Sequence, residues 1–315
     1  MVGEVRSERL VVAVLTYRRP DRIAALVPVL VEQAAELARR VEGVETSVLV
    51  VDNDPDGTGA AVVAGLGAAT VIESEPGISA ARNRALRASE DHDLLVFVDD
   101  DEVPYEGWLS ALHATYVETG ADAVAGPVVS RYLAEPEPWV RAGGFYDRDH
   151  RRGLETGTTI SVAATNNLLL DLRVVRRAGL EFDPALGLSG GEDTHFTSAL
   201  TASGGRIVWC AEAVVSDVVP ADRLTRRYLL ARSAGLANAS ARVALMLAPD
   251  RGRRAALRAR TLAVGIARGL LGSLQVGWAA VRRDVARDAR GRRALARSRG
   301  ELLAACGRVL LPYAR

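Results

Sequence analysis

Carboxylates gather at two places in the sequence, and each place suits a different kind of chemistry. Asp99, Asp100 and Asp101 stand in succession directly after an apolar run. Three adjacent carboxylates repel one another unless a cation neutralises them, and their oxygens suit Mg²⁺ or Mn²⁺. Glu192 and Asp193 follow two glycines, where a carboxylate can take a proton from an attacking hydroxyl. A solvated acidic turn and ordinary acids at a helix start are the alternatives.

Three further segments place polar residues just after apolar runs. Asp52, in VVDND, can hold a base or a ribose, or simply form a turn. Tyr17, in TYRRP, can stack on a base, although the segment equally suits the start of a helix. Gly77 lets the chain turn, Ser79 can cap a helix, and Arg82 on its first turn can face an anion. The sequence has neither GxGxxG after its first apolar run nor GxxxxGK[ST], which weighs against dinucleotide and P-loop sites.

These residues need elements that bring them together, and the first 125 residues supply the pattern. Continuous apolar runs alternate with helical stretches, which predicts a mostly parallel sheet flanked by helices. Ligands of such sheets bind at the carboxyl ends of the strands. We predict strands at residues 10–15, 47–51, 70–73 and 93–98, and helices at 22–40, 59–66 and 79–89.

The pattern changes after residue 123. The chain is almost wholly helical beyond Pro220, so we predict an α/β catalytic domain over residues 1–220 and an Arg-rich helical extension over 221–315. Between them a long irregular stretch, 132–157, is typical of a lid or binding loop. Shorter predicted elements are strands at 123–129, 162–170, 207–209 and 213–215 and helices at 173–178 and 193–203.

The net charge of +1 hides a strong division along the chain. Residues 251–315 carry 16 arginines against Asp284, Asp288 and Glu301, which gives +13 and leaves −12 for the first 250 residues. The sequence contains no lysine, so all of its Lys and Arg count is arginine. The acidic part suits a site that gathers divalent cations, and the basic tail suits an anionic surface such as a membrane. Solvated helices are the alternative for the tail.

Cysteine usage and the chain start favour a cytoplasmic protein. Cys210 and Cys306 form neither a disulfide framework nor a CxxC zinc motif. Glu4 and Arg6 precede the first apolar run, so we expect no signal peptide. Residues 261–281 are apolar but include Arg268, which favours an interfacial or packed helix over a transmembrane one. We therefore expect a cytoplasmic protein that is peripheral at the inner face of the membrane, or whose tail wraps the core or forms a homodimer contact.

The motifs together resemble a known family. TYRRP, VVDND, GISAARNRAL, FVDDDEVP, TNNLLL and GGEDTHF occur in the order of the motif series of family-2 glycosyltransferases, which have the GT-A fold. The resemblance covers roughly residues 10–240. It implies a transfer, with inversion and with Mn²⁺ or Mg²⁺, of a sugar from a nucleotide diphosphate-sugar to an acceptor hydroxyl. A lipid-linked, glycan or small-molecule acceptor is compatible with it, and no nucleic-acid partner is expected.

The resemblance also implies roles for individual residues. Asp193 is the expected catalytic base, with Glu192 beside it, and Asp101 is the expected metal ligand. Asp52 is expected at the nucleotide base with Arg82 near it. Asp99 and Asp100 are expected at the ribose and diphosphate. The full donor-binding set is Thr16, Tyr17, Arg18, Asp52, Arg82, Asn83, Asp99 and Asp100.

The sequence departs from the family pattern in two respects. In the family a histidine often follows the last strand as a further metal or phosphate ligand. Here Asp217 stands at that position, and either it binds the metal or this ligand role is lost. The QxxRW signature of processive synthases is absent, which favours single additions. Aromatic residues of the long loop can form an acceptor platform or fill a core. They are Tyr132, Trp139, Phe145 and Tyr146.

Two other functions stay open at this point. A nucleotidyltransferase also uses an α/β sheet with acidic metal ligands, but it needs a Gly-rich phosphate loop after the first strand, where TYRRP supplies only arginines. A nucleotide-sugar-binding homologue without catalysis is the non-enzymatic alternative. The sequence identifies neither the sugar, the base nor the acceptor.

Overall fold

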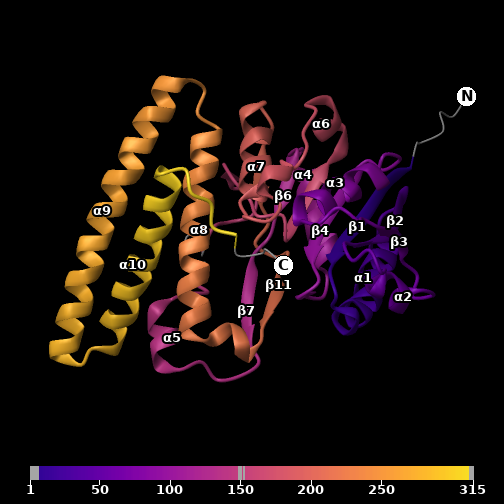
Figure 1. The fold of residues 1–315 in the computed structure, drawn as a ribbon. Coiled ribbons are helices and arrows are strands. Elements are labelled where there is room, and N and C mark those ends of the chain that lie inside the picture. The colour runs from indigo at the N-terminus through magenta and orange to yellow at the C-terminus, as the bar shows by residue number, and fades with distance from the viewer. Residues whose placement is uncertain (1–6, 148–150, 152, 312–315) are drawn as a thin grey trace, which may run out of the picture. The chain divides into compact units, whose positions relative to one another are not determined.

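The chain folds into two compact units (Figure 1). The computed structural model describes residues 7–147, 151 and 153–311, so Glu4, Arg6 and the last four residues of the basic tail lie outside the described residues. The first unit comprises residues 1–129, 148–187 and 192–217. The second comprises residues 130–147, 188–191 and 218–315, and so takes in much of the long stretch that the sequence analysis assigned to the catalytic domain.

An eight-stranded sheet forms the centre of the first unit, in the order β3-β2-β1-β4-β9-β6-β10-β8. The pairs β2–β3, β1–β2, β1–β4 and β6–β10 are parallel, while β9 and β8 run antiparallel to their neighbours. The expected mostly parallel sheet is thus confirmed. Its strands are β1 (Glu8–Thr16), β2 (Val44–Asp52), β3 (Ala69–Ile72), β4 (Leu94–Asp99), β6 (Ala123–Ala125), β8 (Thr159–Ile160), β9 (Asn167–Asp171) and β10 (Ile207–Trp209).

Helices cover both faces of this sheet, because alternate residues of each strand point to opposite sides. Leu10 and Val12 of β1 face the core beneath α1 and α4, and Val11 and Ala13 face the core beneath α3, α6 and α7. Burial on both faces explains why the central strands read as unbroken apolar runs. The helices of this unit are α1 (Pro20–Arg40), α2 (Thr58–Val63), α3 (Ile78–Ala88), α4 (Trp108–Thr119), α6 (Leu172–Arg177) and α7 (Glu192–Ala202), with the 3₁₀ turn η2 (Pro184–Leu186).

The predicted strand at 162–170 is shorter than expected. β9 begins only at Asn167, whose side chain is buried and used for bonding across the sheet. Its Nδ2 donates to the carbonyls of Pro127 and Ala213, and its Oδ1 accepts from Trp108 Nε1 at 2.8 Å. Of the residues before it, Thr165 and Asn166 form a turn, and residues 162–164 are in neither a strand nor a turn. Hydrophobic periodicity does not predict the start of β9, because that start depends on hydrogen-bond partners far away in the sequence.

A small second sheet has the order β5-β11-β7. Within the first unit, β11 pairs antiparallel with β5, so that Asp217 stands opposite Glu102. The boundary between the two units falls within β7 and β11 themselves. The strands are β5 (Glu102–Pro104), β7 (Val128–Tyr132) and β11 (Val215–Val219), where the sequence had predicted 123–129 and 213–215.

The second unit is helical, as expected after Pro220. Its helices are α5 (Pro138–Gly143), α8 (Arg226–Met246), α9 (Arg251–Arg282) and α10 (Val285–Ala305), with the turn η3 (Ala221–Leu224). α10 packs against both α8 and α9 (Figure 1). Glycines allow the close approach, since a Cβ on Gly300 would lie 2.1 Å from the carbonyl oxygen of Ala234.

The aromatic residues of the long stretch fill the core of this unit. Trp139, Phe145 and Tyr146 are buried in one cluster with Leu229 of α8 and Ala289 of α10. The Trp139 and Phe145 rings stack at 5.1 Å, and Trp139 Nε1 donates to Asp288 at 2.7 Å. These three rings therefore fill a core, as one of the two alternatives predicted, and they do not form an acceptor platform. Tyr132, in contrast, is 37% exposed.

Two glycine-to-alanine variants test the helix packing. Gly300→Ala should lower the free energy of unfolding by about 2–3 kcal/mol, because its methyl group would overlap backbone atoms that cannot move freely. The matched control is Gly277→Ala on α9, where a Cβ meets nothing within 4 Å; it should stabilise the helix by about 0.5–1 kcal/mol. Urea unfolding measures both. Equal effects of the two variants would contradict the packing.

Candidate active site

The polar residues predicted from the sequence meet at one edge of the sheet. In the strand register Thr16 lies opposite Asp52, and Leu15 lies opposite Asp99, so β1, β2 and β4 end together. The acidic loop 99–101 and the TYRRP segment are therefore neighbours, and Arg19 and Asp100, which bond each other, lie 81 positions apart in sequence. This is the edge at which open parallel sheets bind ligands.

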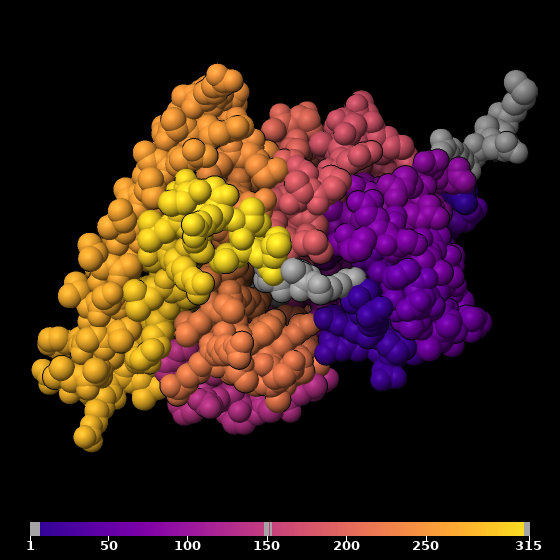
Figure 2. All heavy atoms as spheres, viewed as in Figure 1, coloured from indigo at the N-terminus to yellow at the C-terminus, as the bar shows by residue number. Residues whose placement is uncertain are grey.

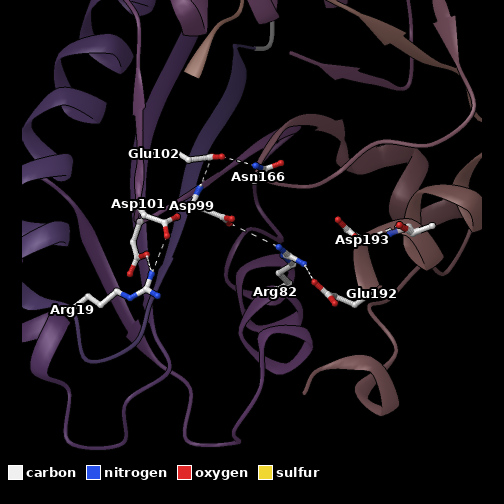
Figure 3. Close-up of polar contacts among 10 residues, drawn as sticks. Arg19, Arg82, Asp99, Asp101, Glu102, Asn166, Glu192 and Asp193 are labelled. Atoms are coloured by element: carbon white, nitrogen blue, oxygen red, sulfur yellow. Dashed lines mark hydrogen bonds and ion pairs between the residues drawn. The ribbon is translucent and has the colours of Figure 1, made fainter. Parts of the chain in front are cut away.

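Arginines hold the acidic loop from the side of α1. Arg19 Nη1 donates to Asp100 Oδ1 at 2.6 Å and lies 3.5 Å from Asp101 Oδ2 (Figure 3). Arg22 Nη1 lies 3.4 Å from the same Asp101 oxygen. The other oxygen of Asp100 accepts from the hydroxyl of Thr16 at 3.0 Å. Asp100 is buried with both oxygens occupied, so the structure gives this residue and Thr16 a role in shaping the loop.

A buried arginine links the acidic loop to α7. Arg82 is 4% exposed; its Nη1 donates to Glu192 Oε1 at 2.5 Å and its Nη2 lies 3.9 Å from Asp99 Oδ1 (Figure 3). Its guanidinium also lies over the ring of Phe182 at 5.5 Å. Asp99 ends β4 and Glu192 begins α7, so one side chain joins the two carboxylate groups found in the sequence.

Negative charge exceeds positive charge around Arg82. Burial raises the pKa of Asp99 to about 7; Arg82 opposes this, while Asp101, Asp100 and Glu192 add to it. The Asp99 side chain is 38% exposed, so water screens part of the effect. Burial also raises the pKa of Glu192, against the lowering by Arg82 and with a further rise from Asp193. A ligand that brings positive charge would relieve this excess.

The two acids at the start of α7 differ in environment. Glu192 is 5% exposed, and its Oε2 is buried without a hydrogen-bond partner among the described residues. Asp193 is only half-buried, and its Oδ1 accepts from the backbone N–H of Thr194 at 2.6 Å and from the Thr194 hydroxyl at 3.2 Å. Glu192 is thus fixed by Arg82, whereas Asp193 reaches solvent.

Asp52 is held by backbone groups at the start of α2. It is fully buried; its Oδ2 accepts from the N–H groups of Gly59 and Ala60, and its Oδ1 accepts from that of Asp54. These bonds satisfy free donors in the first turn of α2. Asp52 therefore anchors this helix to the end of β2, and its role at a nucleotide base stays a prediction.

The remaining expected donor residues also have local partners. Both side-chain atoms of Asn83 bond the backbone of Phe182, at 2.8 Å each. Arg18 adopts φ +51°, lies exposed over the ring of Tyr17 at 5.2 Å, and reaches Asp54 at 3.4 Å. Asn83 therefore has a structural role, while Tyr17 and Arg18 lie at the rim of the strand ends.

Several residues of this site are not among those predicted from the sequence patterns. Arg19 and Arg22 hold the acidic loop, and Glu102 accepts from the Asp99 N–H at 3.3 Å and from Asn166 Nδ2 at 2.5 Å. The spacing of Arg19 and Arg22, three apart at the start of a helix, was a usable signal for a shared anionic partner. Glu102 and Asn166 lay within the quoted motifs, but their pairing depends on the fold.

The acidic loop has the donor chemistry for a divalent cation. Among residues 7–147, 151 and 153–311 there is no group of three or more His, Cys, Asp or Glu side chains that could hold a metal ion, and this includes Asp217. Mg²⁺ and Mn²⁺ sites in phosphate-binding proteins commonly use one or two carboxylates and complete their shell with phosphate oxygens and water. Asp99 and Asp101, with their excess of negative charge, fit that smaller requirement.

The chain has a clear similarity to known sequences. The profile of the family described as Glycosyl transferase family 2 matches residues 11–176. Succinoglycan biosynthesis protein ExoM of Rhizobium meliloti (strain 1021) is 34% identical over 227 residues, which cover 70% of this chain and 70% of that protein. The matched region contains every motif from TYRRP to FVDDDEVP.

Two solved structures share the fold. TarS of S. aureus aligns over 79% of this chain and 41% of its own, with a TM-score of 0.50 and 16% identity. GalNAc-T7, crystallised with UDP, GalNAc and Mn²⁺, aligns over 76% of this chain and 48% of its own, with a TM-score of 0.54 and 12% identity. The chain thus spans less than half the length of either. The fold is of the GT-A type, as the motif resemblance implied.

Removing the buried arginine tests the network. Arg82→Met should lower the free energy of unfolding by about 3–5 kcal/mol at pH 8, because it leaves Glu192 buried without its partner. The double variant Arg82→Met/Glu192→Gln should recover much of that loss. The control is Arg18→Met, which removes an exposed guanidinium from Asp54, a carboxylate that keeps its hydrogen bonds from Asp56 and Thr58, and it should leave the stability nearly unchanged. Urea unfolding in which Arg82→Met and Arg18→Met cost the same would contradict the assignment.

Proposed function

This chain belongs to glycosyl transferase family 2, and on that premise we propose that it transfers a sugar, with inversion, from a nucleotide diphosphate-sugar to a hydroxyl of a glycan acceptor. The family membership decides against a nucleotidyltransferase. The observation that carries the proposal is the buried contact of Arg82 with both Asp99 and Glu192, which ties the strand-end acids to the start of α7 in one unit.

Asp193 is the proposed general base. An acceptor hydroxyl becomes a competent nucleophile when a carboxylate takes its proton during attack. The acceptor oxygen then forms a bond to the anomeric carbon, the bond from that carbon to the diphosphate oxygen breaks, and the electron pair leaves with the diphosphate. Asp193 suits the role because it is half-buried and oriented by Thr194, while Glu192 is held by Arg82. A single displacement of this kind inverts the anomeric centre.

The donor diphosphate is proposed to lie at the acidic loop, where Asp101 would hold Mn²⁺ or Mg²⁺ with Asp99 beside it. When bound, the cation would neutralise the charge that develops on the leaving diphosphate. Arg19 and Arg22 fix Asp101 from the α1 side and add positive charge next to the diphosphate. Asp217 stands opposite Glu102 in the strand register and is proposed as a further ligand.

The relative supports a proposal for the acceptor and the place of reaction. ExoM is described as a succinoglycan biosynthesis protein. We therefore favour a saccharide hydroxyl of a growing glycan as the acceptor, extended one sugar at a time, in the cytoplasm or at the inner face of the membrane.

Replacing the proposed base should separate donor binding from transfer. In Asp193→Asn, transfer to the acceptor should fall about 10²–10⁴-fold, because the amide cannot accept the hydroxyl proton. Calorimetric binding of the nucleoside diphosphate should stay unchanged. The matched control is Asp183→Asn, at the cap of η2, which should keep full activity. Near-normal turnover by Asp193→Asn would show that another group is the base.

A second experiment tests the cation. Mn²⁺ should tighten nucleoside diphosphate binding to the unaltered chain, and Asp101→Ala should abolish this dependence on the metal, because the carboxylate supplies the protein ligand. Asp56→Ala, which removes an exposed acid from the same sheet edge, is the control and should leave the dependence intact. Calorimetry with and without EDTA measures it. Metal dependence that survives in Asp101→Ala would contradict the assignment.

A further inference from the structure

The outer face of α9 carries large apolar side chains that the fold does not use. Leu274 is 70% exposed and Val281 is 81% exposed. Between residues 261 and 281 the only charged side chain is Arg268. Figure 2 shows α9, in orange, running along the surface of the helical unit. We define the α9 apolar face as Val264, Ile266, Leu270, Leu271, Leu274, Trp278 and Val281, each at least 40% exposed.

The opposite side of α9 is built from small residues. Gly265, Gly272 and Ala279 are the buried positions of the helix. A Cβ on Gly272 would lie 2.9 Å from the carbonyl oxygen of Gly291, so the backbones of α9 and α10 approach closely. An ordinary surface helix turns its large apolar side chains toward the core. In α9 the arrangement is inverted, which indicates that the exposed face has a partner of its own.

Positive charge stands at both ends of the α9 apolar face. The face spans about 26 Å at the rise of an α-helix. Trp278, at its C-terminal end, lies 5.3 Å from Arg282 and 5.8 Å from Arg287. Aromatic rings beside arginines are typical of the water–membrane boundary, where the ring enters the apolar layer and the guanidinium stays with the headgroups. At the N-terminal end stand Arg251, Arg253, Arg254, Arg258 and Arg260.

An arginine-lined groove borders the same face. It has a volume of about 460 Å³ and is lined by Arg268 of α9, Arg290, Arg293 and Arg297 of α10, and Asp147 beside Gly144. Burial lowers the pKa of Arg297 and the neighbouring Arg268 lowers it further, while Glu301 opposes this shift. Arg268 lies one helical turn from Val264 and from Leu271, both on the apolar face.

The groove keeps an excess of positive charge. Arg268 pairs with Glu301 at 2.9 Å, and Arg293 donates to the carbonyls of Gly143 and Gly144. Arg290 and Arg297 have no hydrogen bond or ion pair among the residues that the structure describes. One acid, Asp147, lines the groove with four arginines. Its chemistry therefore suits phosphate oxygens.

From these features we propose that α9 lies in the headgroup layer of an anionic lipid bilayer, with the α9 apolar face inserted and the arginine groove holding lipid phosphates. The proposal goes beyond sugar transfer and does not depend on it. A second copy of the chain fits less well, because parallel or antiparallel pairing of two such faces would bring arginine against arginine. A membrane-spanning α9 fits less well too, because its close packing would draw the arginines of α10 into hydrocarbon. By length and composition alone, α9 is long and apolar enough to cross a membrane.

Vesicle binding by the full chain tests the proposal. The chain should sediment with vesicles of phosphatidylglycerol and phosphatidylcholine, and much less with phosphatidylcholine alone. Leu270→Glu/Leu274→Glu should weaken binding at least about 10-fold, because it puts charge into the inserted face. Arg290→Gln/Arg297→Gln should weaken it about 5-fold per arginine. The matched controls are Leu236→Glu on α8 and Arg227→Gln, both outside the face, which should bind like the unaltered chain.

Trp278 gives an independent signal that does not rely on charge-introducing variants. It is 51% exposed, whereas Trp108, Trp139 and Trp209 are buried. Anionic vesicles should shift the emission to the blue, and Trp278→Phe should abolish the shift. Failure to bind anionic vesicles, or binding that is equal with phosphatidylcholine alone, would overturn the proposal. So would a concentration-dependent dimer, seen by sedimentation velocity, that Leu270→Glu/Leu274→Glu dissociates.

Discussion

The buried guanidinium of Arg82 is the interaction on which the candidate active site depends. A buried positive charge is tolerated only with close partners, and here the partners are Glu192 at 2.5 Å and Asp99 at 3.9 Å. The requirement fixes the end of β4, the first turn of α3 and the start of α7 with respect to one another. It also leaves Glu192 Oε2 without a hydrogen bond among the described residues. Strongly perturbed carboxylates of this kind are typical of functional sites.

Much of the first unit could be predicted from the sequence, because its central strands are buried on both faces and read as apolar runs. The acidic loop and the acids of α7 were also identifiable, since adjacent carboxylates rarely occur without a use. What could not be predicted was the use of each polar residue. Asp52 can anchor a helix or form a turn with the same neighbours in sequence, and its bonds to Gly59 and Ala60 appear only in the fold. Arg19 pairs with Asp100 across 81 positions, which no local pattern reveals.

The second unit shows the same limit in another form. Trp139 and Phe145 stand in a stretch rich in glycine and proline, which is typical of a loop, and their partners come from α8 and α10 far along the chain. The sequence of α9 indicated an amphipathic or packed helix without telling which side faces outward. Packing determines which side faces outward. The glycines permit α10 to approach on one side of α9 only, and the leucines lie on the opposite, exposed side.

The glycine contact between α9 and α10 makes the two sides of one helix subject to different selection. On the inner side the limiting property is side-chain volume, because even a methyl group at Gly272 or Gly291 meets backbone atoms. On the outer side the limiting property is hydropathy, and shape matters little in a fluid layer of lipid tails. Mutational scanning of α9 would accordingly separate its positions into a class that tolerates only small residues and a class in which leucine, isoleucine, valine and phenylalanine interchange freely.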